Sequence, residues 1–189
     1  MYENLRSFFD RLNPLDDHEW DAFKKNIKVK CFKKGELIRR EGEIEQNLFF
    51  VCNGGVRVFY LKDGNEINVN FRFENQFTSA YASFLTQTPS RQYIAAIEDT
   101  KLYAIHYSAL QELYATFKNG ECLGRLSAES LFIEKEIHEA SLMLDSPDER
   151  FNSLLEHKKD WIQRIPQKYL ASYLNITPET FSRLKKRNT

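Results

Sequence analysis

The sequence predicts an α+β protein. An N-terminal antiparallel β-roll (a double-stranded β-helix) with flanking helices is followed by a long helix and a C-terminal helix-turn-helix. Three observations predict this order. Between residues 29 and 105, short runs rich in Val, Ile, Phe and Tyr alternate with turn signals. From Ser108 onward the apolar residues recur with a helical period, and near the end of the chain two short helical patterns meet at a tight turn.

The composition limits the classes of protein to consider. Hydrophobic residues make up 42% of the 189 residues, and 15 Phe with 9 Tyr suffice for a packed core, so we expect a folded chain. No stretch approaches 18 apolar residues and the start of the chain does not resemble a signal peptide, so we expect no membrane span and a cytoplasmic location. Neither the three cysteines, which are far apart, nor the four histidines have metal-ligand spacing, so we predict no metal site.

Two helices are predicted before the first strand. Residues 5–12 form a short amphipathic pattern that ends at Asn13-Pro14. Asp16 followed by Glu19 is a capping box, which predicts a second helix from Asp17 to Ile27.

The predicted strands are separated by glycine turns. Asp63-Gly64, between VRVFYLK and NEINVNF, is a strong hairpin signal. Further strand-like runs cover residues 91–97 and 101–105. Six to eight short strands at this spacing favour an antiparallel barrel or roll over a parallel sheet.

Two helices are predicted after the strands. Ser108 is a candidate cap for a helix that ends near Phe117, and a longer helix covers residues 121–144. Its apolar positions alternate spacings of three and four, as in the a/d seam of a coiled coil. The seam, which we expect to be a parallel dimer contact, consists of Leu123, Leu126, Ser130, Ile133, Ile137, Ala140 and Leu144. A second stripe, formed by Leu131, Phe132 and Leu142, is expected to pack on the same chain.

The chain is expected to change direction after the long helix. Ser146, Pro147 and Glu149 form a second capping box with proline at the first helical position. We therefore expect three parts, with residues 1–120 as the β-roll, 121–145 as the dimerisation helix and 146–189 as the helix-turn-helix domain.

The last part combines a helix-turn-helix pattern with a basic charge. Residues 167–174 and 178–187 form two short amphipathic helices, with Thr177 as the cap and Pro178 at the first position of the second helix. From Arg150 to the end of the sequence there are nine Lys or Arg against three acids, a net charge of +6, so the rest of the chain carries −6. This asymmetry favours a polyanion as the partner of the C-terminal part.

Taken together, these segments resemble the Crp/Fnr family of bacterial transcription regulators. FKKGELIRREGE, NLFFVCNGGVRVFY and KDGNEINVNF are similar to the β-roll of the family's cyclic-nucleotide-binding domain. The resemblance implies a homodimer that binds double-stranded DNA, with RNA polymerase as a partner and a small-molecule effector. It is nearest to a branch without a full winged hairpin after the recognition helix, since none follows Arg187.

The resemblance also implies which residues contact DNA. Glu179 and Arg183 match the base-reading positions of the family's R-E-T-x-x-R pattern, whereas Pro178 replaces its first arginine, so the operator should differ from the familiar one. The other residues expected in the interface, mostly as phosphate contacts, are Lys168, Thr177, Thr180, Ser182, Lys185, Lys186 and Arg187.

The sensor pocket departs from the family pattern. Phe77-Thr78-Ser79 lacks the glycine and glutamate of the phosphate cassette, and Arg91 lies one residue past the expected arginine. We therefore expect no cofactor and weak or no binding of cyclic AMP, with the pocket either holding another effector or filled by aromatic side chains. The candidate pocket residues are Phe71, Thr78, Ser79, Tyr81, Ser90 and Arg91. The sequence has no cysteine before Cys31, which argues against the iron–sulfur cluster of oxygen-sensing relatives.

Two other classes of function remain open. The chain is alternatively a ligand-binding module that acts through protein contacts, with its terminal helices as the interaction surface. An enzyme on a double-stranded β-helix is the other alternative, but the sequence has no paired carboxylates, nucleophile elbow or metal-ligand cluster to support catalysis.

Overall fold

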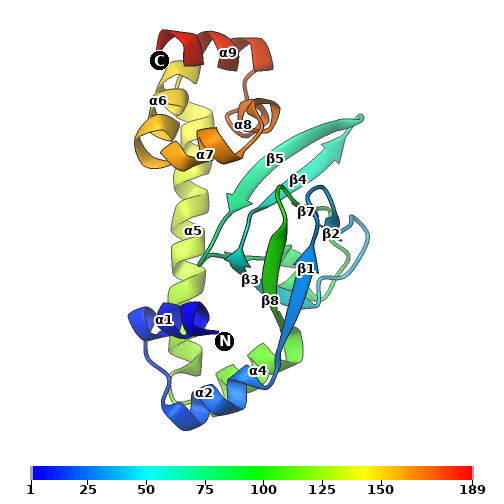
Figure 1. Ribbon diagram of the computed structural model, residues 1–189, viewed down its shortest axis with the longest axis vertical. Helices are drawn as coiled ribbons and strands as arrows, with labels where there is room; N and C mark the ends of the chain where they lie inside the picture. Colours follow the sequence, from blue (N-terminus) through cyan, green and yellow to red (C-terminus); the bar gives the residue numbers. More distant parts are fainter. Residues whose placement is uncertain (1, 189) are drawn as a thin grey trace. The chain divides into compact units, whose positions relative to one another are not determined.

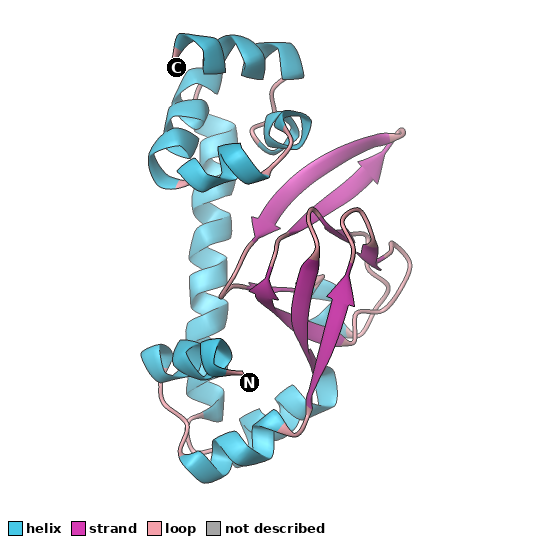
Figure 2. Ribbon diagram, in the orientation of Figure 1, coloured by secondary structure: helices cyan, strands magenta, loops and turns pink. Residues whose placement is uncertain are grey.

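The fold is an α+β arrangement of two compact units, seen in a computed structural model that describes residues 2–188 (Figures 1 and 2). Unit 1 contains the residues up to Val58 together with Phe71–Glu129. Unit 2 contains Phe59–Asn70 and the residues from Ser130 onward. The long helix and the β4–β5 hairpin each contribute to both units.

The strands of the predicted β-roll form two antiparallel sheets instead of a closed barrel. Over the described residues, each sheet has four strands, in the orders β1-β8-β3-β6 and β2-β7-β4-β5. The strands are β1 (Ile27–Phe32), β2 (Leu37–Arg39), β3 (Asn47–Asn53), β4 (Val56–Lys62), β5 (Asn65–Arg72), β6 (Phe77–Thr78), β7 (Tyr93–Ala96) and β8 (Thr100–His106). The predicted roll is therefore confirmed.

Turn residues fix the connections of the roll. Asp63 and Gly64 have φ angles of 51° and 77°, as the predicted β4–β5 hairpin requires. Gly54 has a φ angle of +92°, and a Cβ there would lie 2.6 Å from the Asp99 carbonyl oxygen. Only glycine fits that turn without strain.

The core of unit 1 lies between the first sheet and the helices around it. The helices are α1 (Glu3–Leu12), α2 (Asp17–Lys24), α4 (Tyr107–Thr116) and the first part of α5 (Gly120–Leu144). Their apolar faces enclose a buried cluster that includes Leu5, Phe9, Phe23, Phe50, Tyr103, Ile105, Leu113 and Leu123. Burial of these large side chains provides most of the driving force for this packing.

Two local predictions in unit 1 are wrong, and one short helix was not predicted. The second helix stops at Lys24, and Ile27 already belongs to β1, where it pairs with Ile105. The cap of α4 is His106, whose ring nitrogen accepts from the Ser108 backbone N–H, so Ser108 is not the cap. A short helix, α3 (Tyr81–Thr86), was not predicted because it is too short to show a helical period.

Unit 2 packs four helices around the second half of α5 (Figure 1). They are α6 (Pro147–His157), α7 (Lys159–Arg164), α8 (Gln167–Tyr173) and α9 (Pro178–Arg187). The predicted capping box at Ser146 and Glu149 is present. α7 was not predicted as a separate helix.

Unit 2 also includes the end of the β4–β5 hairpin. The Ser172 hydroxyl on α8 accepts from the Asn68 backbone N–H and donates to the Glu66 carbonyl, each at 2.9 Å. One side chain therefore satisfies two backbone groups of β5, which is the last strand of its sheet.

Candidate nucleic-acid interface

The turn between α8 and α9 is built as the sequence predicts. Asn175 has a φ angle of 51°, and the Ile176 N–H donates to the Ala171 carbonyl at 3.0 Å, which ends α8. The Thr177 hydroxyl accepts from the Thr180 N–H at 3.2 Å, and Pro178 occupies the first helical position. These local bonds set the direction in which α9 leaves the turn.

The inner face of α9 is anchored in the core of unit 2. Phe181 is fully buried and Leu184 is 1% exposed. The Phe181 ring meets Phe151 of α6 edge to face, with centroids 5.3 Å apart. Because this face is fixed, the opposite face of α9 is presented outward in one orientation.

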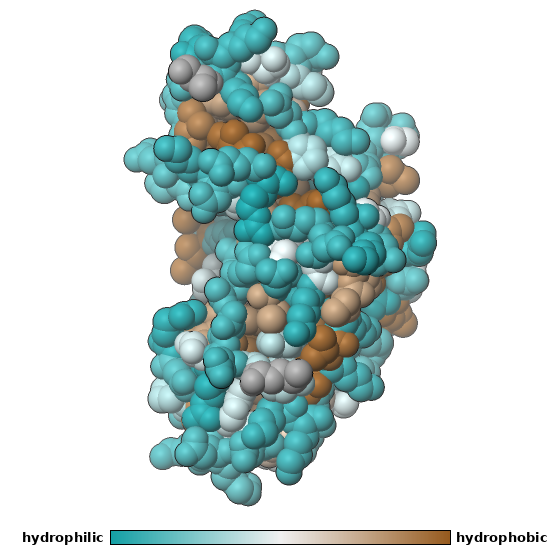
Figure 3. Space-filling view, viewed as in Figure 1, coloured by the Kyte–Doolittle hydropathy of each residue, from teal (hydrophilic) through white to brown (hydrophobic). Residues whose placement is uncertain are grey.

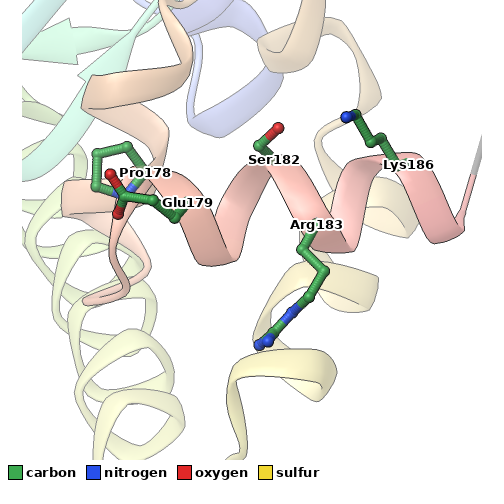
Figure 4. A pocket seen from close by; sticks show the side chains of 5 residues that line it. All are labelled: Pro178, Glu179, Ser182, Arg183 and Lys186. Atoms are coloured by element: carbon green, nitrogen blue, oxygen red, sulfur yellow. The ribbon is translucent and has the colours of Figure 1, made fainter.

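The outer face of α9 is a polar surface with a shallow depression of about 570 Å³. Figure 4 shows its side chains on successive turns, with Ser182 and Lys186 projecting to one side of the helix and Arg183 to the other. The lining residues are Pro178, Glu179, Ser182, Arg183 and Lys186. Four of the predicted DNA-binding residues therefore lie together here, with both hydrogen-bond donors and an acceptor.

Glu179 is suited to accept hydrogen bonds. Bonds from its own backbone N–H and from the Thr177 side chain hold the pKa of Glu179 below its usual value. The carboxylate is therefore ionised at neutral pH, and it lies in the first turn of α9, where the helix dipole favours negative charge.

The other predicted contact residues have different roles in the structure. Thr177 and Thr180 bond to each other in the cap, and Lys168 on α8 is exposed, with its Nζ 4.8 Å from the Tyr169 ring centroid. Lys185 is half-buried. Arg187 forms an ion pair with Asp148 at the start of α6, so this guanidinium is already engaged within the chain.

Two side chains that the sequence analysis did not single out connect α5, α6 and α8. Arg150 on α6 is only 9% exposed and donates from Nε to the Leu174 carbonyl at 2.8 Å and from Nη1 to the Asp145 carbonyl. His138 on α5 stacks on Tyr173 of α8 with ring centroids 4.2 Å apart. No sequence pattern marks them, because each acts on residues of another helix.

The predicted dimer seam runs from a buried to an exposed environment. Leu123 is 3% exposed and packs in the core of unit 1, and Leu126 is half-buried. The seam residues from Ser130 onward are all exposed: Ser130, Ile133, Ile137, Ala140 and Leu144. Figure 3 shows apolar side chains gathered on this flank of α5.

The second stripe of the long helix is only partly packed. Leu131 and Leu142 are half-buried. Phe132 is 68% exposed, so the prediction that Phe132 packs on the same chain is wrong. Phe132 and Met143, at 73% exposure, instead widen the apolar flank of α5.

The candidate pocket residues are largely engaged in the fold of unit 1. Phe71 is fully buried, and the Ser79 hydroxyl donates to the Asn47 carbonyl at 3.0 Å. The Ser90 hydroxyl accepts from the Gln92 N–H at 2.8 Å, whereas Arg91 beside it is exposed.

The remaining pocket candidates and their aromatic neighbours are also packed. Thr78 is 6% exposed and Tyr81 is half-buried, which raises the pKa of Tyr81. Phe73 and Phe84 are buried as well. These aromatic side chains are therefore part of the packed interior of unit 1.

Residues 29–117 match the family described as the cyclic nucleotide-binding domain, whereas no curated protein sequence matches the chain. Among solved structures, the chain is similar to a putative transcriptional regulator of the Crp/Fnr family from Eubacterium rectale (TM-score 0.74, 21% identity, covering 96% of this chain and 87% of that chain). It is also similar to FixK2 from Bradyrhizobium japonicum (TM-score 0.72, 22% identity, covering 85% of this chain and 83% of that chain). A third similar structure is the c-di-GMP responsive global regulator CLP of Xanthomonas campestris (TM-score 0.70, 16% identity, covering 92% of this chain and 91% of that chain).

The likeness to the cyclic nucleotide-binding domain therefore covers residues 29–117. The chain as a whole has the fold of Crp/Fnr regulators, which confirms the resemblance found in its sequence.

Two further findings bear on the other classes of site. Across residues 2–188, no helix has the length and apolar character needed to cross a membrane. In the same part of the chain, His, Cys, Asp and Glu side chains form no group of three that could hold a metal ion.

Proposed function

We propose that the chain is a homodimeric, sequence-specific DNA-binding transcription regulator of the Crp/Fnr type. The observation that carries the proposal is the outer face of α9, where Glu179, Ser182, Arg183 and Lys186 surround one depression while Phe181 and Leu184 anchor the helix from behind. A second helix of a helix-turn-helix with such a face enters the major groove of DNA. The net charge of +6 from Arg150 onward supports a polyanionic partner.

The base-reading role rests on the chemistry of two side chains. An arginine donates two hydrogen bonds to guanine O6 and N7, and a carboxylate accepts from cytosine N4. Arg183 is exposed and Glu179 is held ionised, so both fit these roles. The fold similarity to Crp/Fnr regulators supports the same assignment.

The exposed flank of α5 supports a parallel dimer. Ile133 and Ile137 are 54% and 65% exposed at successive d and a positions, an arrangement that is costly in water and typical of a coiled-coil seam. In a dimer, two copies of α9 would address half-sites about 34 Å apart on the DNA. We propose that an effector shifts the population of this arrangement through the segment between Leu144 and Pro147.

The first test is selection from a randomised duplex pool by the purified protein, followed by titration of the enriched site against salt. We expect a two-fold symmetric site and a steep salt slope. Arg183→Ala should cost about 1–3 kcal/mol of specific binding because it removes a bidentate hydrogen bond to a base. Lys186→Ala should weaken binding to all sequences and reduce the slope by about 0.9 for each phosphate that is no longer neutralised.

Two outcomes would count against this assignment. If the selection enriches no site in the presence of cell extract, DNA is not the partner of α9. If Arg183→Ala and Lys186→Ala both bind the selected site like wild type, α9 is not the reading helix. Lys25→Ala, an exposed lysine between α2 and β1, is the control that should leave binding unchanged.

We further propose that the sensor domain does not use cyclic AMP. The serine hydroxyls of the cassette are engaged with Asn47 and Gln92, and Arg91 is exposed to solvent. A phosphate placed here would lack the arginine partner that makes such interactions strong.

Thermal unfolding with and without cyclic AMP tests this. A ligand that has a dissociation constant above about 1 mM and is present at about 1 mM stabilises the fold by less than about 0.4 kcal/mol. We therefore expect almost no shift in Tm, and Arg91→Ala should behave like wild type. Stabilisation that saturates at micromolar cyclic AMP would contradict the proposal.

A further inference from the structure

An aromatic stack links α5 to the first helix of the helix-turn-helix within unit 2. The His138 imidazole on α5 lies over the Tyr173 ring of α8, with centroids 4.2 Å apart and planes inclined by 5°. The Tyr173 ring also meets the edge of Trp161 on α7, at 5.3 Å. Tyr173 and Trp161 are each 7% exposed, and His138 is half-buried.

The charges around this stack are mostly positive. Lys158, between α6 and α7, donates from Nζ to the Tyr173 hydroxyl at 3.1 Å and lies 4.1 Å from the Trp161 ring centroid. Arg150 of α6 is a second cation that acts on His138, and Glu134 of α5 is the opposing acid. The Lys158 ammonium already lies over the Trp161 ring of this stack. A second positive charge, on His138, would be repelled by it.

We propose that the His138–Tyr173 stack is a protonation-sensitive link that holds α8 against α5. With a neutral imidazole the two flat rings pack face to face. When His138 is protonated, the half-buried imidazolium must be hydrated and is repelled by Lys158, with Glu134 opposing and Arg150 adding to that repulsion, so the stack opens and α8 loses this attachment.

The direction of the effect follows from the surroundings of the imidazole. Burial, and after it the charge of Lys158, lowers the pKa of His138 below its ordinary value. The unfolded or detached state takes up a proton more readily than the stacked state. The contribution of the stack to stability is therefore complete above a pH of about 6.5, the ordinary histidine pKa. It is lost as the pH falls below that value.

Titration of the four histidine rings by NMR in the 189-residue chain tests the link directly. We expect the pKa of His138 to lie below the ordinary histidine value, and its signal to be assigned by its absence in His138→Phe. Over the same pH range, amide protection factors in α8 should fall in wild type as His138 is protonated. His138→Phe keeps a flat ring without a titrating proton and should abolish this fall.

The matched control is His157→Gln, because His157 is on α6 in the same unit but its side chain is 66% exposed. It should retain the acid-induced loss of protection in α8. The proposal is overturned if the pKa of His138 lies at or above the ordinary histidine value of about 6.5, or if the loss of protection persists in His138→Phe.

The effect on DNA rests on the proposed function and is measured separately. With a duplex obtained by selection, wild-type affinity should fall more than that of His138→Phe between about pH 7.5 and pH 5.5, on either side of the ordinary histidine value. Equal pH dependence of the two proteins would show that the stack does not affect DNA binding. If the protein binds no duplex at all, the ring titration and the amide exchange still decide whether the link exists.

Discussion

Ile137→Asp should convert the protein to a monomer and abolish binding to a two-fold symmetric DNA site. Ile137 is 65% exposed in the single chain and lies at the centre of the exposed part of the seam, between Ile133 and Leu144. In a parallel dimer the two copies of this position would face each other, so the substitution removes apolar packing twice and places two like charges side by side.

The expected size of the effect follows from the packing alone. Loss of a buried Ile side chain costs about 2–5 kcal/mol, so two losses weaken the dimer by at least about 4 kcal/mol, or roughly a thousandfold in Kd. Analytical ultracentrifugation at micromolar concentration should show the wild type as a dimer and the variant as a monomer. Titration of the selected duplex should show the loss of DNA affinity.

The control for this experiment is Lys135→Asp. Lys135 is exposed and lies two residues before Ile137, at the f position of the heptad, which faces away from the seam. The Lys135→Asp variant adds an aspartate to the same turn of α5 but should leave the protein dimeric. A monomeric wild type, or dissociation of both variants alike, would remove the support that α5 gives to a dimer.

The sequence predicted the parts of the fold that depend on local interactions. The caps at Asp16, Ser146 and Thr177 are determined by residues within three positions, and each has the expected hydrogen bond. The β4–β5 hairpin is set in the same way by Asp63 and Gly64. The helix-turn-helix pattern succeeded for this reason, because the turn and both apolar faces lie close together along the chain.

What the sequence could not predict depends on contacts between distant segments. The pairing of β1 with β8 joins Ile27 to Ile105, and no local pattern specifies that choice of partner. Arg187 was expected to contact phosphate, but its ion pair with Asp148 arises only when α6 and α9 pack together. The surroundings of His138 likewise arise from α6 and α8, so the histidine had no recognisable motif.

Arg150→Met should destabilise unit 2 by about 2–4 kcal/mol, since a buried carbonyl left without a donor costs about 1–3 kcal/mol and the loss of a partly buried bond adds to this. The Arg150 guanidinium donates to Leu174, at the end of α8, and to Asp145, directly after α5. Both carbonyls lie at helix C-termini, where the dipole favours a cation, so this side chain of α6 joins the end of α5 to the end of α8.

Methionine fills a similar volume but donates no hydrogen bond, which separates the loss of the bonds from the loss of packing. Urea unfolding followed by circular dichroism gives the free energy, and amide exchange locates the change in α6 to α9. Arg125→Met is the matched control, because Arg125 on α5 is 60% exposed and pairs with Glu129 one turn away. An exposed pair of this kind contributes about 0.3–0.5 kcal/mol. If the two variants lose the same stability, Arg150 does not join the helices, and the orientation of α9 must be set by Phe151 and Phe181 alone.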